Sequence, residues 1–315
     1  MRIVFCGTPE FAVPSLRKLL ANPEFAIEAV VTQPDRPRGR GQRVSASPVK
    51  EVAAEAGVRI YQPESMKSEA AREFLVEIKP DAAVIIAYGQ IIPRRLLEIP
   101  RLGWMNLHAS LLPKYRGAAP IAWAIINGES KTGVTTMRLD PGLDTGPILM
   151  QREIEIGSDE TAPELAKRMA EVGAPLVVES LVKLDGGEIA PVPQDSAKAS
   201  YAPILTKEHG RIDWSQTAGE IYNRVRGLAP WPGAFTTFRG KLCHVWGRPT
   251  DAAKDTSAGG QGPGSLRVNS AAIDVVCGKG TRLQLEAVQV EGRKRVSARE
   301  FVNGARIKSG ESLGT

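Results

Sequence analysis

The sequence predicts an α/β, Rossmann-like first domain with a mostly parallel sheet, followed by a small β-barrel as a second domain. Strand and helix signals alternate over about 190 residues from the N-terminus, as in layered α/β folds. Ala82–Ala87 is a continuous apolar run, which is typical of a central parallel strand covered on both faces. Near residue 185 the composition shifts, and short strand signals dominate from there on.

The elements of the first domain, residues 1–184, follow in order along the chain. Arg2–Cys6 predicts a strand, and Gly7-Thr8-Pro9 predicts the turn after it. Further strands are expected at Ile27–Thr32, Arg59–Tyr61, Ala82–Ala87, Trp104–His108, Val134–Arg138 and Ile148–Ile154. Helical apolar spacing predicts helices at Phe11–Leu20, Val49–Ala56, Ser68–Ile78 and Ala162–Leu184.

The second domain is expected over residues 205–310. Asp185–Ala199 is rich in Gly, Pro, Ser, Asp and Ala, so residues 185–204 are expected to form a linker. Beyond it lie one helical stretch near Ser215–Arg226 and the strand signals of Gly233–Arg239, Leu242–Gly247, Ser265–Val268, Ile273–Cys277 and Thr281–Val290. Short strands with a single helix fit a small barrel of the oligonucleotide-binding type.

Several common signals are missing from the sequence. No run of roughly 18 uncharged apolar residues occurs, so we expect no membrane span. Cys6, Cys243 and Cys277 lie far apart and lack metal-ligand spacing, which favours a reducing cytoplasm and metal-free chemistry. Neither a G-x-G-x-x-G nor a Walker motif is present, so no nucleotide cofactor is expected.

The positive charge is concentrated in the last third of the chain. The whole chain has a formal net charge of +6. Residues 1–200 hold 24 Lys and Arg against 25 Asp and Glu, whereas residues 201–315 hold 17 against 10. A basic module on a neutral, enzyme-like body favours a polyanionic partner, although a basic surface that only aids solubility would give the same count.

Asn106 and His108 end the strand predicted at Trp104–His108. Residues two apart in a strand project from the same face, and ligands of open α/β sheets bind at the carboxyl ends of the strands. An amide donor beside an imidazole suits a reaction in which a carbonyl becomes a tetrahedral oxyanion. Asp144, in the Gly/Pro-rich loop Asp140–Pro147, would be able to orient the imidazole and relay protons. Taken singly, each of the three residues also fits an ordinary structural role.

Taken together, these motifs resemble the formyltetrahydrofolate-dependent transferases and hydrolases. The resemblance rests on Asn106-x-His108, on Ser110–Pro113 followed by Tyr115-Arg116-Gly117, and on the Asp140–Pro147 loop. It implies that Asn106, His108 and Asp144 are catalytic. It also implies that two segments border the folate, with the residues Ser110, Leu111, Leu112, Pro113, Ala87, Tyr88, Gly89 and Gln90.

Three further features are similar to the methionyl-tRNA formyltransferase family, and the resemblance runs from residue 1 to residue 308. They are the opening Phe5–Ala12, the insertion Gln33–Gly41, and the tracts Tyr201–Pro203, Arg211–Trp214 and Arg226–Ala234. The resemblance implies transfer of a formyl group from 10-formyltetrahydrofolate to the α-amino group of methionyl initiator tRNA. The implied partners are the folate co-substrate and this tRNA, and the protein is expected to be a cytoplasmic monomer.

The segment Arg36–Arg43, which begins inside this insertion and is called the arginine insertion below, contains four arginines that the resemblance assigns to tRNA binding, namely Arg36, Arg38, Arg40 and Arg43. They alternate with Gly, Pro and Gln, which offer nothing to a hydrophobic core. Such a loop would be mobile when free and ordered against phosphates, and its simpler interpretation is a solvated loop. Trp214, Trp231 and Trp246 are expected in the core or at a domain interface.

Three rival functions stay open. The first is a formyltransferase for a sugar amine or another small amine, which would have no need of the arginine insertion. The second is a hydrolase that passes the formyl group to water. The third is a catalytically inactive RNA-binding protein, which the presence of Asn106, His108 and Asp144 disfavours.

Overall fold

The computed structural model describes residues 1–38, 43–250, 262–268, 272–308 and 310–314. It divides into two compact units. Unit 1 consists of Met1–Pro120, Lys131–Glu155 and Glu164–Pro203. Unit 2 consists of Ile121–Ser130, Ile156–Pro163 and the chain from Ile204 onward.

A seven-stranded sheet forms the centre of unit 1, with the strand order β10-β9-β7-β6-β1-β2-β5. The strands are β1 (Arg2–Gly7), β2 (Ala26–Val31), β5 (Ile60–Tyr61), β6 (Ala82–Ile86), β7 (Trp104–His108), β9 (Lys131–Arg138) and β10 (Ile148–Glu155). β5, β2, β1, β6 and β7 run parallel, whereas β9 pairs antiparallel with both β7 and β10. The predicted mostly parallel α/β sheet is therefore confirmed.

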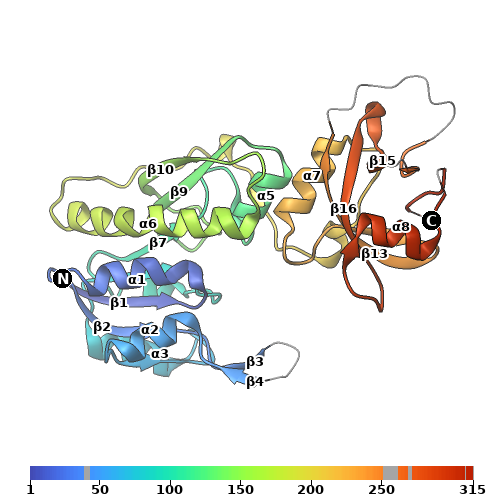
Figure 1. Cartoon of the computed structure of the whole chain (residues 1–315). Coiled ribbons are helices and arrows are strands. Elements are labelled where there is room, and N and C mark those ends of the chain that lie inside the picture. Colours follow the sequence, from blue (N-terminus) through green and yellow to red (C-terminus); the bar gives the residue numbers. More distant parts are fainter. Residues whose placement is uncertain (39–42, 251–261, 269–271, 309, 315) are drawn as a thin grey trace. The chain divides into compact units, whose positions relative to one another are not determined.

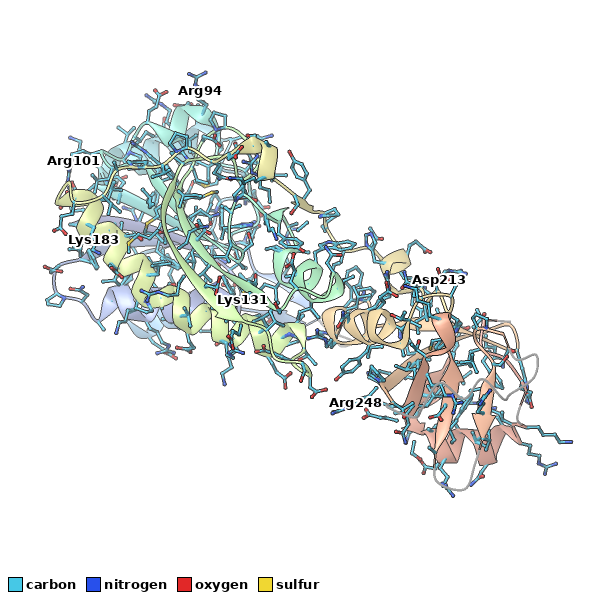
Figure 2. The ribbon with its side chains drawn as sticks, turned by 90° about the horizontal axis from the view of Figure 1, so that it is seen from above. Arg94, Arg101, Lys131, Lys183, Asp213 and Arg248 are labelled. Atoms are coloured by element: carbon cyan, nitrogen blue, oxygen red, sulfur yellow. The ribbon has the colours of Figure 1, made fainter. Side chains whose placement is uncertain are left out.

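The helices of unit 1 cover this sheet (Figure 1). They are η1 (Glu10–Ala12), α1 (Val13–Leu20), α2 (Pro48–Glu55), α3 (Glu69–Ile78), α4 (Arg94–Leu97) and α6 (Ala162–Asp185). The side chains of Ser47 and Ser68 cap α2 and α3 by accepting from the amides of Lys50 and Ala71. Arg101, labelled in Figure 2, donates to Asp185 at 2.8 Å and so fixes the end of α6.

Gly173 allows α6 to lie directly on the strand that carries Asn106 and His108. A Cβ at this position would lie 2.5 Å from Cδ2 of Leu107. Leu107 is buried in the middle of β7, between the two site residues. The hydroxyls of Ser180 and Thr136 lie 2.7 Å apart and join α6 to the neighbouring strand β9.

The arginine insertion forms a short hairpin rather than a simple loop. β3 (Arg36–Arg38) pairs antiparallel with β4 (Arg43–Ser45), and the hairpin projects from the body of unit 1 (Figure 1). Asp35 holds its base through an ion pair with Lys50 and a 2.9 Å hydrogen bond from Gln62. Arg40 lies outside the described residues.

The segment after α6 runs along unit 1 as an ordered strap, residues 186–203. Val192 forms a β-bridge with Ile148. Farther on, after the short η2 (Ser196–Lys198), β11 (Tyr201–Ala202) pairs in parallel with β8 (Arg116–Gly117). The stretch expected as a linker therefore contributes to the packing of unit 1.

Unit 2 is built on an antiparallel sheet with the strand order β12-β13-β16-β15-β14, and β17 pairs with β16. Its strands are β12 (Phe235–Phe238), β13 (Lys241–Pro249), β14 (Leu266–Val268), β15 (Ile273–Val276), β16 (Arg282–Val290) and β17 (Val296–Ser297). The helical segments are α5 (Pro120–Ile126), η3 (Lys207–Gly210), α7 (Ala218–Gly227), η4 (Gly278–Gly280) and α8 (Ala298–Ala305). Phe238 and Phe301 pack edge to face in the core at 5.0 Å between ring centroids.

We predict that Gly173→Ala destabilises the protein. Alanine in a helix interior gains up to about 1 kcal/mol over glycine. Overpacking a tight core costs about 1–3 kcal/mol, so the clash with Leu107 outweighs the gain in helix propensity. Urea unfolding of Gly173→Ala measures the net effect, with Gly219→Ala as the control because a Cβ there meets nothing within 4 Å. Equal stabilisation by both variants would contradict the close packing of α6 on β7.

Candidate active site

β7 presents Asn106 and His108 on the same face at its carboxyl end. Its central position in the sheet fixes both, since Asn106 pairs with Ile85 on one side and Met137 on the other. Asn106 is half-buried, and in the described part of the chain its side-chain amide has no hydrogen-bond partner. His108 is buried, with 6% of its surface exposed. The amide of Asn106 is therefore available to a ligand.

The imidazole of His108 lies between a carbonyl and a carboxylate. Its Nε2 is 2.9 Å from the carbonyl oxygen of Tyr115, and its Nδ1 is 3.7 Å from Oδ2 of Asp144. A carbonyl only accepts hydrogen bonds, so Nε2 carries a proton. Nδ1 is then the nitrogen that the carboxylate faces.

Asp144 reaches His108 because the loop between β9 and β10 folds back across the sheet edge. Its backbone has a positive φ of 51°, and its Oδ2 accepts a 2.8 Å hydrogen bond from the amide of Gly117. Asp140 organises the start of the loop by accepting from Thr145 Oγ1 at 2.8 Å. A Cβ on Gly146 would lie 1.8 Å from the carbonyl oxygen of Arg138, so only glycine fits there.

Hydrogen bonds to neighbouring residues hold the segment Ser110–Pro113 through the hydroxyl of Ser110 and the backbone of Leu112. Ser110 is fully buried, and its hydroxyl donates to the carbonyl of Lys114 at 2.6 Å. Leu112 is also buried, and its carbonyl accepts from Gln151 at 2.9 Å. Leu111 and Pro113 are half-buried. Of the four residues of this segment, which are all expected at the folate, Leu111 and Pro113 have the most surface left for a ligand.

The segment Ala87–Gln90 follows β6, whose end lies beside that of β7 in the parallel sheet. Ala87 and Gly89 are exposed and have positive φ values of 47° and 87°. Tyr88 is only 2% exposed, and burial raises the pKa of its hydroxyl. Gln90 bonds to the chain at Pro63 and Met66. The side chains of Tyr88 and Gln90 therefore support the framework, while Ala87 and Gly89 leave backbone open to a ligand.

Several residues of this site had no motif to mark them. Gln194, on the strap, donates to the carbonyls of Asp144 and Gly146 at 2.8 and 2.7 Å. Thr135 and Gln151 hold the backbone of Leu112 from neighbouring strands. Only their positions in the folded chain mark these residues as part of the site. Gln194, for example, lies in a stretch whose composition indicates only a linker.

The four arginines of the insertion are only partly described. Arg36 is exposed at the start of β3. Arg38 and Arg43 oppose each other in the register of the hairpin. These backbone positions place the two cationic residues on adjacent strands of one projecting hairpin.

Unit 2 contains a cavity of about 520 Å³ with a basic rim. Five cationic residues line it, namely Arg239, Lys241, Arg293, Lys294 and Arg306. Its apolar wall includes Phe238 and Phe301, and Glu300 is the acidic residue of its lining. The carboxylate of Glu300 is occupied by the capping box of α8, where it accepts from Ser297. The cavity therefore suits an anionic ligand.

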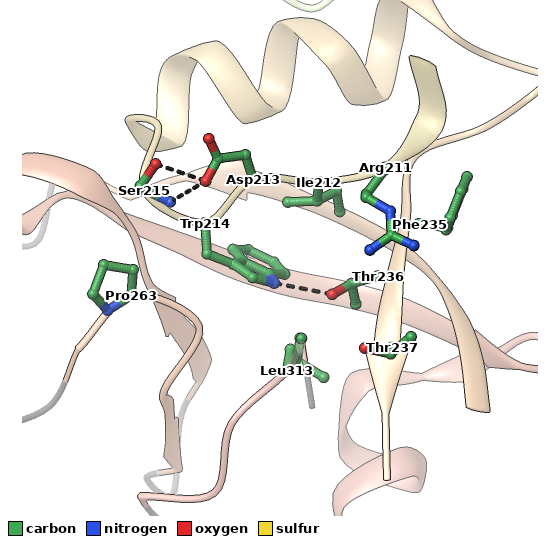
Figure 3. A pocket seen from close by; sticks show the side chains of 11 residues that line it. Arg211, Ile212, Asp213, Trp214, Ser215, Phe235, Thr236, Thr237, Pro263 and Leu313 are labelled. Carbon is green, nitrogen blue, oxygen red and sulfur yellow. Dashed lines mark hydrogen bonds between the residues drawn. The ribbon is translucent and has the colours of Figure 1, made fainter. Parts of the chain in front are cut away.

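A second cavity of unit 2, about 350 Å³, lies beside Trp214 (Figure 3). The indole donates to Thr236 at 3.1 Å, and Asp213 accepts from Ser215. Trp214 is 6% exposed, as expected for a core residue, whereas Trp231 is 59% exposed and does not lie in the core. Trp246 is half-buried beneath the guanidinium of Arg295, which lies 4.0 Å from its ring centroid.

The described residues form neither a cluster of metal-ligating side chains nor a membrane-spanning helix. They contain no group of three or more His, Cys, Asp or Glu side chains able to hold a metal ion. None of the helices in the described ranges is long and apolar enough to cross a bilayer.

Comparison with known proteins identifies the class of the protein. The formyl transferase family model matches residues 1–181, and the model of the formyl transferase C-terminal domain matches residues 204–306. The fold resembles WlaRD, a sugar 3N-formyl transferase crystallised in the presence of dTDP and 5-N-formyl-THF, with a TM-score of 0.66 at 19% identity over 93% of this chain and 99% of that one. Fold and site together define a formyl transferase.

Full-length relatives narrow this class. The methionyl-tRNA formyltransferase of Solibacter usitatus is 52% identical over 100% of this chain and 99% of its own length. That of Koribacter versatilis is 50% identical, again over 100% and 99% of the two chains. The chain belongs to the methionyl-tRNA formyltransferase family.

We predict that Asn106→Ala, His108→Ala and Asp144→Ala each lower turnover by about 100-fold or more. This is the usual loss when one preorganised oxyanion donor is removed, as in the first two variants, or when a positioned acid–base group is removed, as in the third. Substrate binding is expected to survive better than turnover, because these groups act mainly in the transition state. Steady-state formylation with circular dichroism as a folding check measures both effects. Near-normal turnover of His108→Ala would overturn the assignment.

Proposed function

We propose that this enzyme transfers the formyl group of 10-formyltetrahydrofolate to the α-amino group of methionyl initiator tRNA, which prepares it for translation initiation. One observation carries the proposal. A chain that matches methionyl-tRNA formyltransferases along its whole length brings His108 and Asp144 to 3.7 Å of each other, beside an unengaged Asn106 amide. This is an arrangement suited to acyl transfer.

The proposed reaction proceeds through a tetrahedral intermediate. The neutral amine of the methionyl group attacks the formyl carbon, and the carbonyl electron pair moves to oxygen. Asn106 donates a hydrogen bond to this oxyanion, and protonated His108 stabilises its charge. When the intermediate collapses, the bond from the formyl carbon to the folate nitrogen breaks. The proton lost by the amine is passed to that leaving nitrogen, and no covalent enzyme intermediate forms.

The geometry around His108 supports this division of roles. Tyr115 holds Nε2, so the ring cannot rotate freely and Nδ1 stays beside Asp144. The 3.7 Å separation is beyond hydrogen-bond range, so the carboxylate acts on the imidazole through its charge. We propose that the carboxylate compensates the imidazolium charge, receives the amine's proton through water and passes it on to the leaving folate nitrogen.

We propose that the folate lies against Leu111, Pro113, Ala87 and Gly89, the members of the two segments that leave surface or backbone open to a ligand. Solved relatives of the fold support a folate donor, since HypX from Aquifex aeolicus was crystallised with tetrahydrofolic acid. That structure has a TM-score of 0.61 at 16% identity and covers 99% of this chain and 48% of its own. Ser110, Leu112, Tyr88 and Gln90 then shape the pocket from behind.

For the tRNA we propose contacts in both units. In unit 1 the hairpin around Arg36, Arg38, Arg40 and Arg43 would meet the phosphate backbone. In unit 2 the basic cavity provides a second site for phosphate groups, and Arg293 and Lys294 are among the residues that line it. The concentration of positive charge in residues 201–315, to which the five cationic residues of the cavity contribute, supports the contact in unit 2.

We also propose that the protein acts in the cytoplasm as a monomer and needs no metal. Its three cysteines are free and buried, which fits a reducing compartment. Burial raises the pKa of the Cys6 thiol and keeps it unreactive. Size-exclusion chromatography with light scattering tests the monomer.

We predict formylmethionyl-tRNA as the product when the protein is incubated with 10-formyltetrahydrofolate and methionyl initiator tRNA. Addition of a metal chelator should leave the rate unchanged. Parallel reactions with a nucleotide-linked amino sugar and with water as the sole acceptor test the rival functions. Formylation of the amino sugar alone, or formate release alone, would contradict the tRNA assignment.

We predict that replacing Arg38, Arg40 and Arg43 together with Ala weakens the use of tRNA and flattens its salt dependence. An arginine that neutralises one phosphate of a duplex stem contributes about 0.9 to the magnitude of the log–log salt slope. The control variant replaces Arg17, Arg94 and Arg152, exposed arginines on other elements of unit 1, and so removes the same charge. Identical slopes for the two variants would show that the hairpin does not touch the tRNA backbone.

A further inference from the structure

Gln194 has all of its side-chain hydrogen-bonding capacity engaged at the active site. Its Nε2 donates to the carbonyl oxygens of Asp144 at 2.8 Å and Gly146 at 2.7 Å. Its Oε1 accepts from Nε of Arg116 at 3.0 Å and from Nη2 at 2.8 Å. One neutral amide thus joins the loop of Asp144 to a guanidinium.

The guanidinium on the other side of this amide is unusually placed. Arg116 is only 3% exposed, yet within the described residues it forms no ion pair with a carboxylate, and Gln194 is its side-chain partner. A buried cation polarises a neutral acceptor and strengthens the hydrogen bonds on both sides of it. The orientation of the Gln194 amide is also fixed, because its oxygen must face Arg116 and its nitrogen must face the loop.

The loop that receives these hydrogen bonds needs external support. Asp144 has a φ of 51°, which is unfavourable for a residue with a side chain and persists only where its surroundings hold it. Gly117 holds its carboxylate and Gln194 holds its carbonyl. Without the hydrogen bond from Gln194, the backbone would relax to a commoner conformation and turn the carboxylate away from His108.

The same strap also fixes the opposite side of His108. Ser200 accepts from the amide of Tyr115 through its hydroxyl, at 2.9 Å, and from the amide of Arg116 through its carbonyl, at 2.8 Å. Tyr115 in turn presents the carbonyl that faces Nε2 of His108. The strap therefore holds both neighbours of the imidazole, one through Ser200 and the other through Gln194.

We propose that Gln194 is a positioning residue that places Asp144 against His108. The proposal rests on the proposed function, since it assigns Asp144 a part in formyl transfer. Gln194 touches neither substrate, and it acts through the backbone of the Asp144 loop. The two hydrogen bonds it donates are the feature required, whereas the bond it accepts from Arg116 sets its orientation.

Gln194→Glu separates these two functions. Glutamate has nearly the same shape and still accepts from Arg116, now as an ion pair, so we expect its melting temperature to match that of the wild type. As a carboxylate it cannot donate to the carbonyls of Asp144 and Gly146 and instead repels them. We expect kcat to fall by about tenfold to 100-fold, the effect typical of a small misplacement of a reacting group, while both KM values stay within about twofold.

The control is Asn22→Asp, the same change from amide to carboxylate at a residue outside both the site and the hairpin. The side-chain oxygen of Asn22 accepts from the amide of Glu24 at 3.0 Å, and a carboxylate retains this hydrogen bond. We expect its kcat to stay within about twofold of the wild type. Gln194→Glu with wild-type kcat would overturn the proposal, since a role limited to structure requires only the retained hydrogen bonds from Arg116.

Crystal structures of the wild type and of Gln194→Glu supply a readout that does not depend on turnover. We expect the Asp144 carboxylate to leave Gly117 and move beyond its 3.7 Å separation from Nδ1 of His108 in the variant. An unmoved Asp144 would overturn the proposal even if activity fell. Failure of the proposed function looks different, because the wild type itself would then formylate no methionyl-tRNA while the structural comparison still decides the role of Gln194.

Discussion

The arrangement on which the site depends is the imidazole of His108 held between the carbonyl of Tyr115 and the carboxylate of Asp144. The ring is buried at the end of a central parallel strand, where Asn106 lies beside it on the same face. Neither neighbour of the ring belongs to that strand. Both Tyr115 and Asp144 adopt positive φ values, 60° and 51°, and depend on hydrogen bonds from elsewhere in the chain, among them those of the strap.

Much of this architecture is predictable from the sequence because its signals are local. The apolar run Ala82–Ala87 identifies a central strand whatever surrounds it, and β6 is buried along its whole length. The two-residue spacing of Asn106 and His108 places them on one face by strand geometry alone. The prediction of a catalytic role for Asp144 needed the family resemblance, because an aspartate near glycine in a turn is common and indicates no particular chemistry.

The remaining features depend on contacts between distant segments, which periodicity does not encode. Gln194 meets Asp144 across 50 positions of the chain, from a stretch whose composition indicates only a linker. The hairpin of the arginine insertion lacks apolar alternation, so no strand signal marks it. Helix α8 does carry a local signal, the capping box Ser297-x-x-Glu300, although it is not among the predicted helices. Trp231 is exposed despite its size, since burial depends on neighbours that the sequence does not specify.

The most direct test of this account is the protonation pattern of the His108 ring in the free enzyme, read from its ¹⁵N shifts. The chain has 3 histidines, so comparison with a His108→Gln variant assigns the signals. The account predicts that in the neutral ring the proton resides on Nε2, facing the Tyr115 carbonyl, and that Nδ1 is bare. A neutral ring protonated on Nδ1 would contradict it, because Asp144 would then be occupied in a fixed hydrogen bond and the Tyr115 carbonyl would face an acceptor.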